Sequence, residues 1–348
     1  MSRIETVQNW ISKTIEGTYN TADSTGSNYS QVPSQNPFFV LPKLEKLSDA
    51  NRIGMNAPTH LCSHYWRPGQ YGFADDAETD VPARLFRRSL GGAVTDTVVV
   101  AATVWDHTFA ILPPQTGAIL PSFGMASLLD AASFLLHGCM VDRFKISQKG
   151  DQRAQYEADI VQSGKFTNPH GLTALPVLSP PPCMDSFRTK IHYTDSDGST
   201  DVDLGSVGKV IEWSVEHKNN VNTAKRRIGD PIQTVSTSGS GAYVRRLPRG
   251  KYETTVGMLI DFLDLTDWTK SVQNLTFTNL KITVVGPLID ATNRHEFEII
   301  VPKFAFESVD PGDDDGDAAT QLNIVPLQDP VSLGTITGRI RNNQATLL

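Results

Sequence analysis

The centre of the chain, residues 141–160, carries the pattern that decides the fold: VDRFKISQKGDQRAQYEADI. From Ala154 to Ile160, apolar and polar residues alternate, which is the pattern of a strand with one buried face. The Lys149-Gly150-Asp151 triplet before it is typical of a tight turn. The stretch therefore predicts a β-hairpin whose return strand places Tyr156 in the core.

Upstream of this hairpin, the sequence predicts a strand, a helix and an N-terminal arm. Residues 97–105 are β-branched and follow Gly91-Gly92, so we expect a buried or half-buried strand. The apolar run 123–136, opened by Pro121-Ser122 and ended by Gly138, predicts a helix. Residues 1–36 join a short apolar patch to a run rich in Thr, Ser, Asn and Gln, which favours an arm.

The second half repeats the order strand, helix, hairpin. Residues 207–217 and 252–263 read as strands, and residues 275–285 with 296–306 read as a second long hairpin. Between them, residues 264–269 could open a short helix. The buried parity switches near Pro302, which predicts a bulge or an edge position there.

A proline-rich stretch, residues 176–182 (PVLSPPP), separates the two halves. Proline lacks the amide donor and restricts the residue before it, so this stretch cannot join a central strand or continue a helix. We therefore expect a mainly-β chain with an arm over residues 1–36, a first domain over 37–178, and a second over 179–348 that ends in a C-terminal arm.

Composition excludes several classes of protein. The 348 residues are 39% hydrophobic, enough for two cores, and no run reaches the roughly 18 apolar residues of a membrane span. The start lacks the order of a signal peptide, so we expect a chain that stays where it is made and does not insert into a membrane.

Cys62, Cys139 and Cys183 are widely spaced and odd in number, as expected of reduced thiols. A net charge of −7 argues against a general nucleic-acid binder.

Motifs for catalysis or metal binding are weak. His60 and His64 have no second cluster to complete a zinc site. The acidic stretches 195–203 and 310–317 lack the order of an EF-hand, so solvated turns are favoured over opportunistic calcium binding. Phosphate-binding loops and G-x-S-x-G elbows are also missing from the sequence. We therefore predict no catalytic residue, no cofactor and no metal ligand, and a protein that is not an enzyme.

Charge is distributed unevenly along the chain. Residues 218–251 carry eight Lys and Arg, with Asp230 as the only acid, whereas the two acidic stretches contain no Lys or Arg. Three interpretations remain open: complementary patches across a subunit interface, a solvated loop, and a nucleic-acid footprint with Tyr243 as its main aromatic residue.

Residues 138–147 (GCMVDRFKIS) and 156–164 (YEADIVQSG) resemble the tail tube family of long-tailed, siphovirus-like bacteriophages. That family carries a G-x-x-V-D-x-φ-x-φ-S strand and a return strand that ends in glycine. Residues 210–215, followed by Asn219-Asn220, and residues 297–302, followed by an acidic loop, continue the likeness. Gly257, Asp329 and residues 341–343 also fit. The resemblance extends from about residue 35 onward.

The resemblance implies two tandem tail-tube-type β-barrel or β-sandwich domains, each with a flanking helix. It implies a structural virion protein that self-assembles into stacked rings and forms the conduit for genome delivery. With two tube domains per chain, a trimeric, pseudo-hexameric ring is expected. Implied partners are other copies of the chain, a tape measure protein in the lumen, tail terminator and tail tip proteins, and genomic DNA in transit without sequence-specific binding. The implied location is the virion tail, after synthesis and assembly in the host cytoplasm.

Two alternatives stay open. One is another tail subunit of similar architecture, such as a baseplate or terminator protein. The other is a carbohydrate-binding or glycoside-cleaving β-protein, although the aromatic content of 8% gives it little support. For a tube subunit, the candidate assembly contacts lie in the N-terminal arm, the basic segment and the second acidic stretch. They are Trp10, Ile11, Ile15, Lys225, Arg226, Arg227, Arg245, Arg246, Asp313, Asp314 and Asp315.

Overall fold

The computed structural model describes most of the chain, and this part is mainly β, as the sequence predicts. The described residues are 7–32, 44–48, 61–66, 69–101, 103–112, 119–129, 132–150, 152–172, 175–176, 182–184, 188–194, 201–204, 210–224, 230–235, 239–243, 245, 247–261, 276–314, 317–329, 334–345 and 347. Within them there is one α-helix, α1 (Val81–Leu90). None of the helical segments in these ranges has the length and apolar character needed to cross a membrane.

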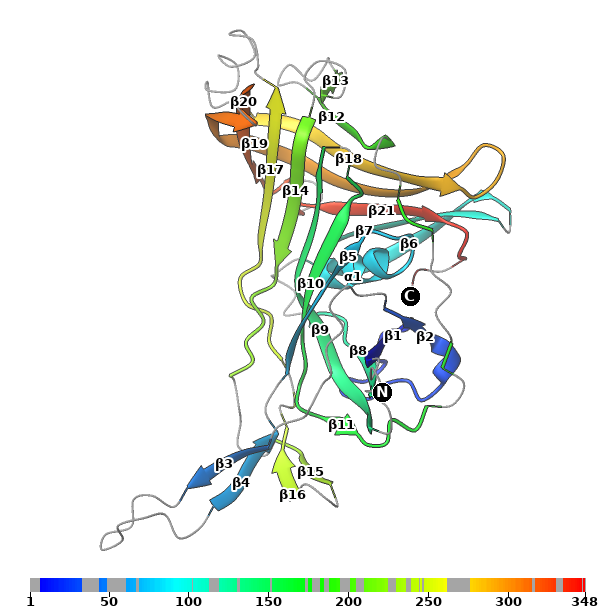
Figure 1. Cartoon of the computed structure of the whole chain (residues 1–348), viewed down its shortest axis with the longest axis vertical. Coiled ribbons are helices and arrows are strands. Elements are labelled where there is room, and N and C mark those ends of the chain that lie inside the picture. Colours follow the sequence, from blue (N-terminus) through cyan, green and yellow to red (C-terminus); the bar gives the residue numbers. More distant parts are fainter. Residues whose placement is uncertain are drawn as a thin grey trace, which may run out of the picture.

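A continuous antiparallel sheet forms most of the fold and branches at β19 (Arg294–Asp314). One branch contains, in spatial order, β6 (Gly91–Val100), β7 (Val104–Ile111), β21 (Thr337–Asn342), β19, β18 (Thr276–Leu288), β12 (Lys190–Thr194) and β13 (Asp201–Asp203). The other continues from β19 through β20 (Asp317–Pro326), β17 (Glu253–Asp261), β14 (Val210–Lys218), β9 (Ala132–Lys149), β10 (Gln155–Val161) and β5 (Gln70–Asp76). Figure 1 shows the two branches crossing at a steep angle.

The branch point explains the parity switch near Pro302. One edge of β19 pairs with β21 from Glu296 to Ile300, and then with β20 from Phe304 onward. Pro302, which has no amide hydrogen to donate, lies in the gap between these partners. Val301 and Phe304, the buried residues on the two sides of this gap, are three positions apart, so the buried side of the alternation switches here. The predicted edge position is therefore confirmed.

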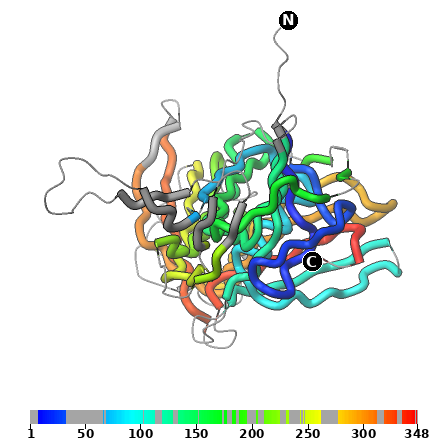
Figure 2. Tube along the Cα trace, turned by 90° about the horizontal axis from the view of Figure 1, so that it is seen from below, coloured from blue at the N-terminus to red at the C-terminus, as the bar shows by residue number. Residues whose placement is uncertain are grey.

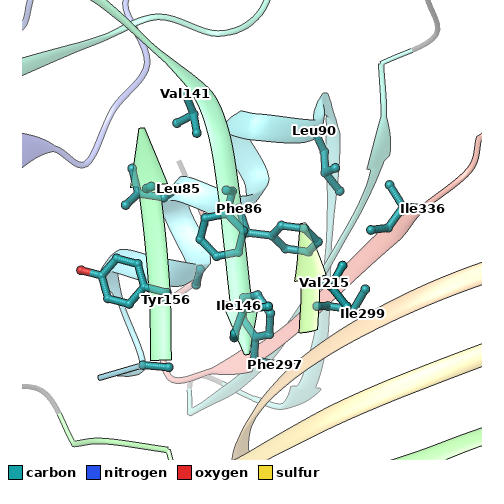
Figure 3. Packing of buried hydrophobic residues seen from close by; sticks show 14 of the residues in the cluster. Leu85, Phe86, Leu90, Val141, Ile146, Tyr156, Val215, Phe297, Ile299 and Ile336 are labelled. Carbon is teal, nitrogen blue, oxygen red and sulfur yellow. The ribbon is translucent and has the colours of Figure 1, made fainter. Parts of the chain in front are cut away.

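Helix α1 lies between the two branches and joins their cores. The Phe86 ring lies 5.2 Å from the Phe144 ring of β9 and 5.2 Å from the Phe297 ring of β19. Figure 3 shows Leu85, Phe86 and Leu90 of the helix pointing into this cluster. Burial of such large side chains contributes about 2 kcal/mol each, so the helix is a central packing element.

The prediction of a helix over residues 123–136 is wrong. These residues belong to β8 (Phe123–Leu129) and to the start of β9, which pair antiparallel. Neighbouring residues Met125 and Ala126 are both fully buried, so the strand is covered on both faces and its apolar run lacks the alternation of a half-exposed strand. Gly138, expected to stop a helix, lies inside β9 with φ +64, beside a register shift.

The sequence-based interpretation missed α1 itself, although its end signals are present. Asp80 precedes the helix and Pro82 lies in its first turn. Gly91 ends it with φ +78, and the Gly91 amide donates to the Arg87 carbonyl. The prediction used Gly91-Gly92 only as the start of a strand.

The N-terminal arm prediction does not hold for residues 7–32. The segment β1 (Val7–Ser12) lies between β2 (Tyr29–Gln31) and β8, and η1 (Gly26–Asn28) precedes β2. The short strand β11 (Phe166–Thr167) pairs with β9 beside them. These segments form a layer with its own buried side chains, including Trp10 and Tyr29.

Four short strands form a separate sheet in the order β15, β16, β4, β3. They are β15 (Ile232–Val235), β16 (Gly239–Ala242), β4 (Leu61–Trp66) and β3 (Leu44–Ser48). A parallel pairing of Ala242 with Tyr65 joins the two hairpins. Figure 1 shows this sheet projecting from the lower end of the molecule. We call it the projecting sheet.

Most hairpin predictions are confirmed. In β9 and β10, Tyr156 lies opposite Ile146 and both are buried. In β18 and β19, Ile282 lies opposite Ile299. The strands expected over 207–217 and 252–263 appear as β14 and β17. The helix expected over 264–269 lies outside the described residues, as does most of the proline-rich stretch.

Strand pairing crosses the predicted boundary between the halves. Strand β9 pairs with β14, and β7 pairs with β21. The largest buried cluster also contains residues of both halves, including Phe144 and Phe297. The two halves therefore share one core, and the domain boundary at 178/179 stays a prediction.

Candidate assembly surfaces

Strand β6 is an edge strand with an exposed apolar end. Within the described part of the chain it pairs only with β7. Residues 97–105 were expected to form a single buried or half-buried strand. Instead β6 ends at Val100 and β7 begins at Val104, and Val98, Val99 and Val100 are 50%, 39% and 39% exposed. The prediction is wrong because a β-branched run indicates a strand but does not indicate what covers it.

The exposed valines lie on a rim with one further apolar side chain. Val98 lies opposite Trp105, and Trp105 lies opposite Asn342. The residue before Asn342 in β21, Arg341, lies opposite Glu296. Leu288, at the end of β18 near Glu296, is 53% exposed. Figure 1 shows the β6–β7 and β18–β19 hairpins ending together at the right. Unpaired backbone and exposed apolar side chains thus meet at one rim, a combination that favours strand addition.

Beneath this rim, β6 is anchored by a buried histidine. Asp96 Oδ1 lies 2.6 Å from His107 Nδ1, across the β6–β7 pair. His107 Nε2 lies 3.0 Å from the Gln344 carbonyl, so this nitrogen donates to it. Because a backbone carbonyl occupies the second ring nitrogen, this pair fixes the edge strand to the C-terminal segment and has no nucleophile to activate.

The branch that contains β6 has a polar outer face. Arg339 lies at its centre and donates to Glu298 Oε1 at 3.0 Å, Glu296 Oε2 at 2.9 Å and Asp106 Oδ2 at 3.2 Å. Burial opposes ionisation of Asp106, but Arg341 and Arg339 outweigh it and hold the pKa of this carboxyl below its usual range. Beside this network lies a groove of about 390 Å³, lined mainly by charged and hydroxyl side chains of β12, β18 and β19.

The outer face of the second branch is polar as well. Arg143 on β9 contacts Glu157 at 2.9 Å and Asp159 at 3.5 Å on β10, and it also contacts Glu216 on β14. Three strands are therefore linked by cross-strand ion pairs on the solvent side. The fold therefore has two polar, solvent-facing surfaces around one apolar interior.

Both ends of the described chain are bound to helix α1. Arg84 donates to the Lys13 carbonyl at 3.2 Å and to Gln344 Oε1 at 2.5 Å, and Arg88 donates to the Ser12 carbonyl. Leu347 is 2% exposed. Figure 2 shows the blue N-terminal segment beside the red C-terminal segment. These two segments pack on the helix because buried arginines need the carbonyl and amide oxygens that the segments supply; the C-terminal arm, for which no bounds were predicted, stays a prediction.

The predicted contact residues are scattered over the fold. Trp10 and Ile11 are 3% and 0% exposed in the interior of the single chain, and their role as assembly contacts stays a prediction. Ile15 is 38% exposed and Arg245 is exposed. Asp313 and Asp314 are the last residues of β19. The remaining candidates, Lys225, Arg226, Arg227, Arg246 and Asp315, lie outside the described residues.

The acidic stretch at 310–317 forms the end of a hairpin. Asp313 lies opposite Ala318, and Asp314 opposite Asp317, where β19 turns into β20. This agrees with the turn that the sequence favours over a calcium loop. In the described ranges, no three His, Cys, Asp or Glu side chains are grouped as metal ligands would be. The thiols of Cys139 and Cys183 are free, and burial raises the pKa of Cys139 well above its usual range.

Part of the basic segment belongs to the core. Arg249 donates to the Leu112 carbonyl at 2.9 Å and lies 4.7 Å from the Tyr252 ring centre. Burial lowers the pKa of Arg249 to about 10. In contrast, Arg245 and Lys251 are exposed. The sequence predicts a loop here, but β15 and β16 form within it because they pair with each other and with β4.

The edge strand and the projecting sheet are the surfaces that sequence reasoning missed. The β-branched run 97–100 was the signal for the edge strand. The projecting sheet had no local signal, because it depends on pairing between distant segments. A scan against models of known protein families gives no match, and a search of curated proteins finds no similar sequence.

Proposed function

We propose that this chain is a tail tube subunit of a long-tailed bacteriophage, a structural protein that self-assembles into stacked rings and forms the conduit for the genome. The observation that carries the proposal is β6, an edge strand whose outer edge is unpaired within the described residues and whose end exposes three valines. An uncovered β-branched edge promotes aggregation unless a partner strand covers it. In a ring, the partner is the next copy of the chain.

The two polar faces support the same function. A subunit in the wall of a hollow cylinder has one face toward the channel and one toward the exterior, and both are wet. The networks around Arg339 and Arg143 supply charged outer faces on the two branches. Neighbouring copies must then join at their edges, where β6 lies.

The sequence resemblance in residues 138–164 and 210–215 adds the assembly context. It favours a trimeric, pseudo-hexameric ring, a tape measure protein in the lumen, and terminator and tip proteins at the ends of the tube. Genomic DNA would pass without sequence-specific binding. The location is the virion tail, after assembly in the host cytoplasm.

Two other functions share some of these features. A baseplate or terminator subunit would also use sheet edges, but it would be present in few copies per virion. A glycoside-cleaving protein needs a carboxyl group free to donate a proton. In the groove, Arg339 contacts both oxygens of Glu298 and also Glu296, an arrangement that favours a structural ion-pair network.

The test is a charge placed on the exposed edge. Val99→Lys should leave the fold intact, because Val99 is 39% exposed, but it should prevent edge pairing since a lysine on an edge opposes strand addition. Val99→Thr keeps the β-branched shape and is the matched control. Negative-stain electron microscopy of both proteins, with their unfolding temperatures, is the measurement. Normal tubes from folded Val99→Lys would overturn the role of this edge.

A further inference from the structure

The projecting sheet lacks a second layer in the described part of the chain. Its four short strands pack chiefly on one another, and Figure 1 shows them standing away from the body. Ile232, at the start of its edge strand β15, is 74% exposed. A sheet normally buries one face against another element, so a single projecting layer is stabilised when a partner covers it.

The segment that supplies two of these strands is basic. Residues 218–251 contain eight Lys and Arg and one acid. The described exposed cation beside this sheet is Arg245, close to the end of β16, whereas Lys251 lies next to the start of β17 in the body. A partner of opposite charge therefore suits this end of the molecule.

The opposite end of the molecule is acidic. Two hairpins, β12–β13 and β19–β20, turn there, and Figure 1 places them at the upper end of the longest axis while the projecting sheet lies at the lower end. Their strand residues, together with the last residue of β17, carry seven acids and no Lys or Arg near the turns. These acids are Asp201, Asp203, Asp261, Asp310, Asp313, Asp314 and Asp317.

We propose that the projecting sheet of one copy docks on the β12–β13 and β19–β20 hairpins of a second copy, so that subunits stack head to tail along their longest axis. The proposal rests on the tail tube function and names the contact that joins one ring to the next. A contact between two different surfaces of the same chain does not close on itself along this axis, so it generates a filament. Opposite charges fix the order of the two ends and speed their encounter.

Charge reversal at each end tests the contact. The acidic-end variant is Asp310→Lys with Asp313→Lys, and the basic-end variant is Arg245→Glu. Reversing one side brings like charges together, so each variant should form roughly tenfold less sedimentable polymer than the unaltered chain, the loss expected for about 1.4 kcal/mol. A matched control on the broad face, Lys190→Glu with Lys281→Glu, should polymerise normally.

Two further samples make the test specific. A chain with both ends reversed should regain tubes, because opposite charges again meet. A mixture of the two single-end variants should also regain tubes, in which the variants alternate, since each sheet end then meets hairpins of opposite charge. Recovery by the fully reversed chain also shows that the substitutions do not simply unfold the protein.

The outcomes separate this contact from the proposed function. If the unaltered chain forms tubes and each single-end variant forms them equally well, the head-to-tail contact is wrong and the tube function stands. A fully reversed chain that folds but fails to regain tubes also overturns the contact. If the unaltered chain forms no rings or tubes, the proposed function fails, and the stacking contact fails with it.

Discussion

Protonation of His217 should destabilise the fold at mildly acidic pH. The side chain is fully buried at the lower end of β14. His217 Nε2 lies 3.5 Å from Arg249 Nη2, and since a guanidinium can only donate, this nitrogen is the acceptor. The Nδ1–H of His217 then donates to Thr254 Oγ1 at 2.9 Å. A second proton would face a guanidinium without access to water.

The size of the effect follows from linkage. Burial, reinforced by Arg249, lowers the pKa of His217 from 6.5 to about 3. The unfolded chain therefore takes up the proton first, so this stability is present above pH 6.5 and is lost as pH falls toward 3. At about pH 4 the loss from this one residue is about 3 kcal/mol, at roughly 1.4 kcal/mol for each pH unit below the unfolded value.

The assay compares the chain with His217→Gln, whose amide can donate and accept in similar positions but does not titrate. Urea unfolding at about pH 7.5 and about pH 4 gives the free energy of unfolding of each protein. The variant should lose about 3 kcal/mol less than the unaltered chain over this interval, and other titrating groups cancel in the comparison. Equal losses would refute the assignment of a neutral, buried His217.

Two further predictions concern buried positions. Burial raises the pKa of Glu78 from 4.5 to about 7, so the folded state holds this proton and stability falls as pH rises between these values. Glu78→Gln should remove a fall of about 3 kcal/mol from the pH profile of urea unfolding; an unchanged profile would contradict this. Gly164 has φ +96, and a Cβ there would lie 2.5 Å from the Trp66 carbonyl oxygen, whereas Gly150 has φ +53 and open space. Gly150→Ala should cost about 1 kcal/mol and Gly164→Ala more than about 2 kcal/mol, and equal costs in thermal unfolding would contradict the steric argument.

Strands with one wet face could be predicted from the sequence. In β10 and β14, buried Tyr156 and Trp213 alternate with polar neighbours, because water on one face requires polar side chains there. The turn of the β9–β10 hairpin was equally clear from Gly150. These elements placed the mainly-β class correctly.

Of the two elements misassigned from periodicity, one carried a helical period and the other did not. Every residue of α1 is buried, yet Arg84, Arg87 and Arg88 lie at i, i+3 and i+4 on one face, so the helical period was present in the sequence and was overlooked. In β8, Met125 and Ala126 are buried on opposite faces, and the same apolar run suits a buried helix or a buried strand. The arginine face of α1 and its terminal signals, such as Gly91, could both have corrected the first error.

The assembly surfaces could be predicted only in part from the sequence, for a different reason. Sequence patterns show which residues favour a strand, but they do not show whether a strand such as β6 has a second neighbour. The projecting sheet depends on the pairing of Tyr65 with Ala242, which no local pattern encodes. Conversely, Trp10 suggested an exposed anchor because its partner strands, β2 and β8, are distant in the sequence.

Negative-stain electron microscopy of the purified protein, after concentration and warming, tests the central claim most directly. The account predicts hollow cylinders of uniform diameter, built from rings of three chains that present six similar units. A preparation that stays monodisperse and monomeric, with no rings or tubes at any concentration, would contradict the assignment of this chain as a tail tube subunit.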